Sequence, residues 1–377
     1  MIKTRLHFLD SIRGIAAFCV LLSHTFACFL FAPSPLLQTI SRHIFIFDGQ
    51  FAVRIFFVLS GMSLSIAYLS APLKNETKNC FEAKECVHEL AFRQLKRMIA
   101  QRYFRLALPI AMTSTLIMIM INMGCMVNNK IDNQFSNDWI NLFFHLNHVS
   151  TDYFLKFSFY DSIFTHGTDK YWLGNSINPV LWTMPIEFMG SMLVLICILL
   201  LKDDKRKWMG YWILAVFFYM CNSFMFHFIL GIFISELYVK YQHIYLSFDN
   251  KVNYMSIAII ILLLIFTSLT SPRSIGITGL ISFLIILLCS TNKLVITFLE
   301  KPIFLFLAKI CFTLYLVHLP IITSLTSFLV KKFDPIFPLH ITILLSGTIT
   351  IIVSIFTAYI LAFGEKTLIL FYKKVIS

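Results

Sequence analysis

Ten long apolar stretches, separated by short charged segments, limit what this chain can fold into. A helix crosses a bilayer in about 20 residues. Such stretches occur at 8–31, 51–70, 103–123, 181–201, 209–221, 223–239, 252–270, 274–291, 303–330 and 338–363. The chain is 58% hydrophobic and 13% charged, with a mean hydropathy of +0.80. The sequence therefore predicts an all-α polytopic membrane protein, with about ten transmembrane helices in one bundle that forms a single domain over 1–377.

The region 209–239 is short for two spans of about 20 residues each. The charges on either side of it decide the interpretation. Lys205 precedes the region and Lys240 follows it, so both of its ends are expected on one side of the membrane. We therefore predict two short helices joined by a hairpin at Asn222–Ser223.

The lysine and arginine residues are distributed unevenly between the two sides of the predicted bundle. Most of the 31 Lys and Arg residues lie in segments on the side of the N-terminus. Because positive charge favours the cytoplasmic side, we predict that both termini and the polar segment 71–101 are cytoplasmic, and that 124–180 is an outer loop. The lipid bilayer then accounts for the net charge of +12 without a nucleic-acid partner.

Several other structural features find no support in the sequence. The first apolar stretch lacks a cleavage site followed by a polar region, so it is predicted to be a retained span. The nine cysteines have no paired spacing, and those in the predicted cytoplasmic loop are expected to stay reduced. His145, His148 and His166 form no convincing ligand set. We therefore predict no disulfide framework and no metal site.

Arg13 and His24 lie on one face of the first predicted span. They are eleven positions apart, close to three helical turns, which places His24 roughly 16 Å further along the helix axis. If Arg13 lies at the membrane surface, His24 is buried in the hydrocarbon layer, where an ionisable side chain indicates a function. The alternative is a histidine that only hydrogen-bonds a neighbouring helix.

Glu187 is the acidic residue that falls well inside a predicted span. It lies roughly 8 Å below the outer end of its helix, and His24 lies roughly 10 Å below the outer end of its own. The similar depths predict that Glu187 orients the imidazole of His24 and stabilises its protonated form, as the partner of a general base does. The alternative is a buried carboxylate held by hydroxyl groups.

Two arginines lie at the cytoplasmic start of the third predicted span. Arg102 and Arg105, at positions i and i+3, share one helical face. Together they can clamp phosphate oxygens through bidentate hydrogen bonds. The alternative is a pair of positive charges that only fixes the topology.

Three further side chains are candidates for the lining of a cavity. Arg54 can extend to the outer surface or contact an anionic group on a substrate. Tyr315 and His318, at i and i+3, share one face of their helix, and a structural role for both is the simpler interpretation. Ser60 and Gly61 allow the close approach of another helix and need no catalytic role.

Five segments resemble, in order, the signatures of the membrane acyltransferase 3 family. The segments are Leu9–His24, Phe51–Gly61, Arg102–Pro109, Leu181–Glu187 and Ala308–Pro320. They are similar to L-D-x-x-R-G-x-A-A with a later histidine, F-F-V-L-S-G, R-x-x-R-x-x-x-P, L-W-S-x-x-x-E and G-x-x-S-Y-x-x-Y-L-x-H-x-P. The departures include Arg54 in place of a short polar residue and Thr183 in place of serine.

The resemblance implies an enzyme that transfers an acyl group, above all acetyl, from cytoplasmic acyl-coenzyme A to a hydroxyl of a cell-envelope polysaccharide or lipid-linked glycan. It implies catalytic roles for His24, Glu187 and Arg13, and a donor site at Arg102 and Arg105. Acyl-coenzyme A is then a substrate, and no bound cofactor is expected. The expected location is the bacterial cytoplasmic (inner) membrane. None of the signatures lies in the outer loop, which is the natural place for acceptor selectivity.

A proton-coupled transporter or exporter is the rival interpretation. Buried His24, Glu187 and His318 can form a proton relay, as ionisable residues do in pumps. Transporters often contain inverted repeats and broken helices, and the sequence shows neither. A purely structural scaffold is a third interpretation, against which three buried ionisable groups argue.

The predicted topology can be tested by cysteine labelling. A cysteine introduced at Asp152 should react with a membrane-impermeant reagent added to intact cells, and one introduced at Lys205 should react only after the membrane is opened. A variant without the native cysteines serves as the background. Labelling at position 205 from outside would contradict the hairpin predicted within 209–239.

Overall fold

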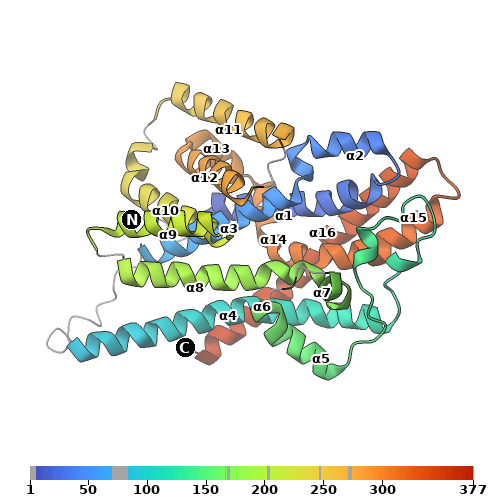
Figure 1. Ribbon diagram of the computed structural model, residues 1–377, viewed down its shortest axis with the longest axis horizontal. Helices are drawn as coiled ribbons and strands as arrows, with labels where there is room; N and C mark the ends of the chain where they lie inside the picture. The colour runs from blue at the N-terminus through green and yellow to red at the C-terminus, as the bar shows by residue number, and fades with distance from the viewer. Residues whose placement is uncertain are drawn as a thin grey trace.

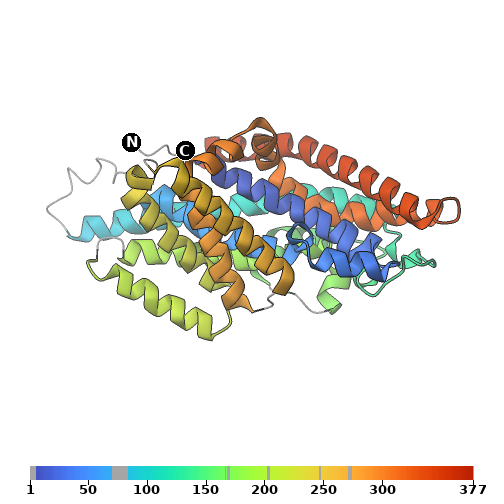
Figure 2. The same cartoon turned by 90° about the horizontal axis from the view of Figure 1, so that it is seen from above.

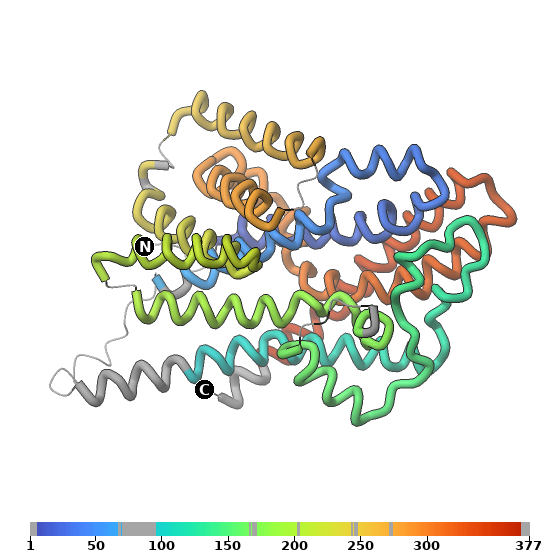
Figure 3. The backbone as a smooth tube through the Cα atoms, viewed as in Figure 1, coloured from blue at the N-terminus to red at the C-terminus, as the bar shows by residue number. Residues whose placement is uncertain are grey.

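The computed structural model describes residues 6–69, 84–165, 167, 170–201, 204–245, 248–270 and 274–376. Within these residues, all regular secondary structure is helical, as the sequence predicted. Most of the long helices run roughly along one axis (Figures 1 and 2), and the path of the backbone can be followed in Figure 3.

The helices of the described chain fall into long, connecting and non-α classes. The long helices are α1 (His7–Leu22), α3 (Gly49–Leu69), α4 (Lys84–Asn122), α8 (Met184–Leu201), α9 (Lys207–Met220), α10 (Met225–Tyr245), α11 (Asn250–Thr270), α12 (Ile275–Thr291), α14 (Pro302–Ile321) and α16 (Leu339–Ile376). The connecting helices are α2 (Pro35–Arg42), α5 (Thr151–Lys156), α6 (Ser162–Phe164), α7 (Lys170–Asn175), α13 (Lys293–Leu299) and α15 (Ser327–Phe333). The π-helices are η1 (Ser23–Leu30), η6 (Phe157–Asp161) and η8 (Ile322–Thr326), and the 3₁₀ turns are η2 (Phe45–Phe47), η4 (Asn128–Lys130), η5 (Ile140–Leu142) and η7 (Pro179–Thr183).

Seven helices in the described residues are long and apolar enough to cross a membrane. They are His7–Leu30, Gly49–Ile66, Lys96–Asn122, Pro179–Leu201, Asn250–Thr270, Pro302–Phe333 and Leu339–Leu370. The number is eight if α12 and α13, which meet at a bend of 92°, form one broken span. The predicted number of about ten is not confirmed. α9 has only 14 residues, and α10 carries Glu236 and Lys240 in its second half.

The two ends of the described chain lie at the same end of the bundle. The start of α1 and the last turns of α16 are close to this end, whereas α2, α5, α7 and α15 lie at the opposite end, called the far end below (Figure 1). An even number of membrane crossings gives this arrangement, and the count of eight is even. The first span therefore carries the chain from the N-terminal end to the far end.

Glycine allows the central helices to approach one another closely. A Cβ atom on Gly14 would lie 2.5 Å from the backbone nitrogen of Ala308, and one on Gly61 would lie 2.3 Å from the carbonyl oxygen of Phe228. Both distances are shorter than a van der Waals contact, so α1 packs on α14, and α3 on α10, through glycine. The close helix approach predicted at Gly61 is confirmed.

The predicted outer loop contains more helix than the sequence suggested, and the predicted cytoplasmic segment is helical from Lys84 onward. Segment 124–180 includes η4, η5, α5, η6, α6 and α7, and Asn128 holds it together by donating to the carbonyl oxygens of Ile140 at 2.9 Å and Phe143 at 2.8 Å. Segment 71–101 is helical from Lys84 onward because α4 continues without interruption to Asn122. The rest of that segment lies outside the described residues.

Candidate active site

His24 lies in the π-helical stretch that ends the first span. α1 passes directly into η1, where the N–H of Phe31 bonds the carbonyl of Phe26 at 2.8 Å, five residues earlier in the chain. Stretches of π-helix are rare and occur frequently at functional sites. The local structure therefore supports a functional role for the face that carries His24.

His24 and His318 form a hydrogen bond across the interface of α1 and α14. Nδ1 of His24 lies 2.9 Å from Nε2 of His318, and Nδ1 of His318 lies 2.7 Å from the carbonyl oxygen of Tyr315. Because a carbonyl oxygen only accepts, Nδ1 of His318 carries a proton and Nε2 of neutral His318 accepts. Nδ1 of His24 is then the donor, and Nε2 of neutral His24 keeps a free lone pair.

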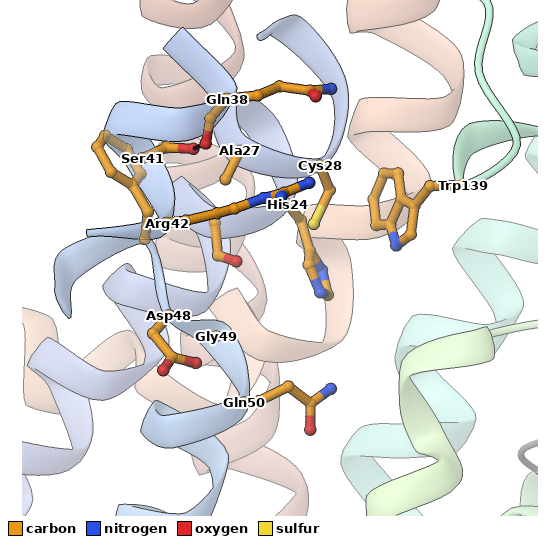
Figure 4. Close-up of a pocket in the computed structure, with 12 residues that line it drawn as sticks. His24, Ala27, Cys28, Gln38, Ser41, Arg42, Asp48, Gly49, Gln50 and Trp139 are labelled. Atoms are coloured by element: carbon orange, nitrogen blue, oxygen red, sulfur yellow. Dashed lines mark hydrogen bonds between the residues drawn. The ribbon is translucent and has the colours of Figure 1, made fainter. Parts of the chain in front are cut away.

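Nε2 of His24 has no hydrogen-bond partner in the described part of the chain. His24 is half-buried and lines a cavity of about 450 Å³. Figure 4 shows its imidazole between the side chains of Cys28, Gln50 and Trp139. The indole of Trp139 is the nearest aromatic neighbour on this side, with its ring centre 5.1 Å from that of the imidazole. A basic nitrogen therefore lies beside a space that a small molecule can enter.

Glu187 pairs with Arg102 rather than with His24. The Arg102 guanidinium donates to the Glu187 carboxylate and, through Nε, to Ser191 Oγ at 2.7 Å. Both charged side chains are 13% exposed. The structure thus differs from the predicted His24–Glu187 pair, because a guanidinium neutralises a carboxylate in a low-dielectric interior and a neutral imidazole does not. Depth estimated from helix ends could not show that α4 brings Arg102 to the level of Glu187.

Arg13 lies toward the other end of the first span from His24. Its guanidinium donates to the carbonyl oxygen of Leu59 at 3.1 Å and pairs with Asp10 at 3.3 Å. The helical rise separates Arg13 from His24 by roughly 16 Å. Arg13 therefore ties α1 to α3 and does not touch the imidazole.

Arg105 belongs to a charged cluster on the N-terminal side of the site. The side chain is exposed, and the charges of Arg102, Arg13, Glu365 and Asp10 act on it. Arg102 is engaged by Glu187, so Arg105 is the member of the predicted pair that is better placed to bind an anion. Arg13, a member of this cluster, lies about three helical turns before His24 along the first span, and this spacing gives the distance between the cluster and His24.

The three residues predicted as possible cavity-lining residues, Arg54, Tyr315 and His318, are buried and do not line the cavity beside His24. The Tyr315 hydroxyl lies 2.9 Å from Thr183 Oγ1 and donates to the carbonyl of Val180 at 2.9 Å. Tyr315 therefore fixes α14 against η7, the 3₁₀ turn that precedes α8. The charge of Asp48, which does line the cavity, acts on Arg54.

The sequence named His318 as a possible cavity-lining residue and as a member of a proton relay, but it did not single out Trp139, Gln38, Ser41 or Arg42. His318 was expected to be structural, and its contact with His24 joins residues 294 positions apart, which no local pattern reveals. Trp139 lies in the segment without a family signature. Gln38, Ser41 and Arg42 have helical spacing and could have been recognised as one polar face.

The arrangement places a hydrogen-bonded pair of imidazoles beside a ligand-sized cavity. Among the residues that the structure describes, no cluster of three or more His, Cys, Asp and Glu side chains is placed to hold a metal ion. The ionisable groups described above are the imidazole pair and the charged cluster.

The family comparison agrees with this class of site. A family model described as an acyltransferase domain matches residues 6–361, so the chain belongs to the membrane acyltransferase 3 family, as the signatures indicated. Comparison with curated proteins and with solved structures gave no match. The protein is therefore an integral membrane acyltransferase.

The contact between Arg102 and Glu187 can be tested as a stability element. Arg102→Ala leaves an unpaired buried carboxylate and should lower the free energy of unfolding by about 3–5 kcal/mol. Replacing both residues, as Arg102→Met with Glu187→Leu, should restore most of this loss because no buried charge remains. Thermal unfolding in detergent measures both effects.

Lys156→Ala provides the control, because the ion pair of Lys156 with Asp161 is on the surface, with the lysine 67% exposed. Its effect should stay within about 0.5 kcal/mol. If Glu187→Gln abolished acyl transfer without any loss of stability, Glu187 would have a chemical role that the ion pair does not explain.

Proposed function

We propose that the protein transfers an acyl group, specifically acetyl, from acyl-coenzyme A to a hydroxyl group of a cell-envelope polysaccharide or lipid-linked glycan. The observation that carries the proposal is the hydrogen-bonded pair of His24 and His318, which leaves Nε2 of His24 basic beside a cavity. Transfer to a hydroxyl requires a base at the acceptor oxygen, and a neutral imidazole is suited to this role.

In the proposed reaction, Nε2 of His24 accepts the proton of the acceptor hydroxyl while the hydroxyl oxygen attacks the thioester carbonyl carbon. A C–O bond forms, the C–S bond breaks, and the proton on His24 passes to the coenzyme A thiolate as it leaves. His318 accepts from Nδ1–H of His24 throughout, so it holds the ring orientation and supports the imidazolium. The carbonyl of Tyr315 fixes His318 in turn. Neither contact supplies a negative charge, so the support is by hydrogen bonding.

The donor is proposed to bind on the N-terminal side of the bundle. Exposed Arg105 offers a planar fork of donors for the coenzyme phosphates. Arg102, held by Glu187 and Ser191, contributes positive charge there and keeps α4 against α8. An extended donor arm must then cover roughly 16 Å, the rise between Arg13 and His24, to bring its thioester to the imidazole.

The proposed setting is the bacterial cytoplasmic membrane, with both termini in the cytoplasm. Coenzyme A esters would then reach the cluster around Arg105, and the glycan would reach His24 from the far end. Release of free coenzyme A when acetyl-coenzyme A and a candidate glycan are supplied tests the transferase assignment. A transporter would release none.

His24 and His318 can be separated by substitution. His24→Gln keeps hydrogen bonding but cannot exchange a proton at neutral pH, so it should lower acyl transfer at least about a hundredfold, as His24→Ala does. His318→Asn should lower kcat and leave the KM for acetyl-coenzyme A unchanged, since His318 acts through the orientation of His24. Coenzyme A release measures both.

His43→Gln is the matched control, because His43 is exposed and, just after the end of α2, its ring nitrogen Nδ1 donates to the carbonyl of Thr39 at 2.8 Å. It should retain full activity. Strong acyl transfer by a well-folded His24→Gln protein would contradict the base role.

Arg105 can be tested by donor binding. Arg105→Ala should weaken acetyl-coenzyme A binding by about 1.5–3 kcal/mol for each charge-assisted hydrogen bond lost. Arg105→Lys should also be impaired, because lysine lacks the bidentate fork. Arg206→Ala, at a 78% exposed arginine, should bind normally. Unchanged donor affinity and activity in Arg105→Ala would leave Arg105 a topology anchor.

A further inference from the structure

The cavity beside His24 is built mainly from segments that carry none of the base and donor functions. α2 contributes Gln38 and Arg42, the start of α3 and the turn before it contribute Asp48 and Gln50, and the folded 124–180 segment contributes Trp139. The volume of the cavity, about 450 Å³, lies within the range of small-ligand sites, about 300–1,000 Å³. The charged cluster around Arg105, where the acyl donor is proposed to bind, lies toward the other end of α1. The cavity is therefore available to the acyl acceptor.

α2 is amphipathic, and its polar face forms one wall of the cavity. Leu36 and Ile40, at i and i+4, are 69% and 46% exposed on the opposite face. Gln38 and Arg42, also at i and i+4, both line the cavity. An exposed apolar face beside a polar one is typical of a helix in the membrane interface. The cavity therefore opens where water meets lipid at the far end.

Trp139 provides a flat apolar surface beside the basic nitrogen. The indole lies 5.1 Å from the His24 ring and meets Phe143 edge to face with ring centres 5.0 Å apart. The side chain of Asn128 donates to the carbonyl oxygens of Ile140 and Phe143, in the short turn that follows Trp139 in the chain. The indole is thus held in place, and the C–H face of a sugar ring can stack on it while the ring hydroxyls point away.

The polar side chains around this surface match a ring of hydroxyl groups. Gln38 and Gln50 each offer a donor and an acceptor, as hydroxyl groups do, while Arg42 donates and Asp48 accepts. Asp48 also caps α3 by accepting from the N–H of Phe51 at 2.9 Å. The positive charge of Arg42 and the negative charge of Asp48 balance one another, so the lining carries no net charge that would select an ionic ligand.

We propose that this cavity is the acceptor subsite and that it binds an uncharged pyranose ring, stacked on Trp139 with one hydroxyl directed to Nε2 of His24. This inference rests on the proposed acyl transfer, and it adds the residues and the ligand class of the acceptor side. Gln50 lines the cavity together with His24 (Figure 4) and contributes hydrogen bonds to the neighbouring hydroxyls. Trp139 is then a specificity-determining residue for the acceptor.

The experiment measures binding of two small probes to the purified full-length protein without any donor. The probes are methyl glucoside and methyl glucuronide, which share a ring and differ by one carboxylate, and saturation-transfer NMR gives the dissociation constants. The wild-type protein should bind methyl glucoside saturably and more tightly than methyl glucuronide. Trp139→Ala should weaken binding of the glucoside by about tenfold or more.

Gln50→Ala, at an exposed position, should also weaken glucoside binding. This second variant keeps the proposal testable if Trp139→Ala misfolds. Trp212→Ala is the matched control, because Trp212 is 61% exposed on α9 and does not line the cavity. Equal binding by wild type, Trp139→Ala and Gln50→Ala, or tighter binding of the glucuronide, would overturn the proposal. Coenzyme A release is measured separately, so failure of acyl transfer is distinguishable from failure of sugar binding.

Discussion

The hydrogen bond between His24 and His318 is the contact on which the site depends, and it exists only because two helices approach closely. Gly14 lets the backbone of α1 lie against Ala308 of α14, ten positions along each helix from the imidazoles. The bond then fixes which nitrogen of His24 is basic. A residue with a side chain at position 14 would separate the two helices. Ten residues at about 1.5 Å of rise each place this contact one to two nanometres from the imidazoles, so the hydrogen bond of His24 depends on packing at that distance.

Charges inside the bundle are neutralised by neighbours on adjacent helices, which lets a polar site exist in an apolar setting. Glu187 meets Arg102 between α8 and α4, and Glu236 meets Lys207 at 2.8 Å between α10 and α9. An isolated charge at such positions would be costly, and a paired one is tolerated. The same pairs fix the relative heights of the helices. Arg105 differs from these, because its surroundings contain both signs of charge while its side chain stays accessible.

The sequence predicted the class of fold and placed Arg13 and His24 in one span, because both depend on local patterns. Apolar run length gives spans, and helical spacing places Arg13 and His24 on one helix. Partner assignments were less predictable. Glu187 and His24 have similar distances to their helix ends, but the long α4 reaches past the expected start of its span and brings Arg102 to the carboxylate. His318 meets His24 because of how α1 and α14 pack, which spacing within either helix does not encode. The predicted number of about ten spans was not confirmed, because α9 is short and α10 is polar at one end.

The amphipathic character of α2 makes the bilayer itself part of the site's geometry. Leu36 and Ile40 face outward while Gln38 and Arg42 face the cavity, so lipid that covers the two apolar side chains would act directly on this wall of the cavity. A thinner or thicker hydrocarbon layer costs fractions of a kcal/mol per Å of mismatch, and α2 is a helix of only eight residues. The shape of the cavity is therefore expected to follow membrane thickness, and a detergent micelle and a native membrane would present different openings to the same acceptor.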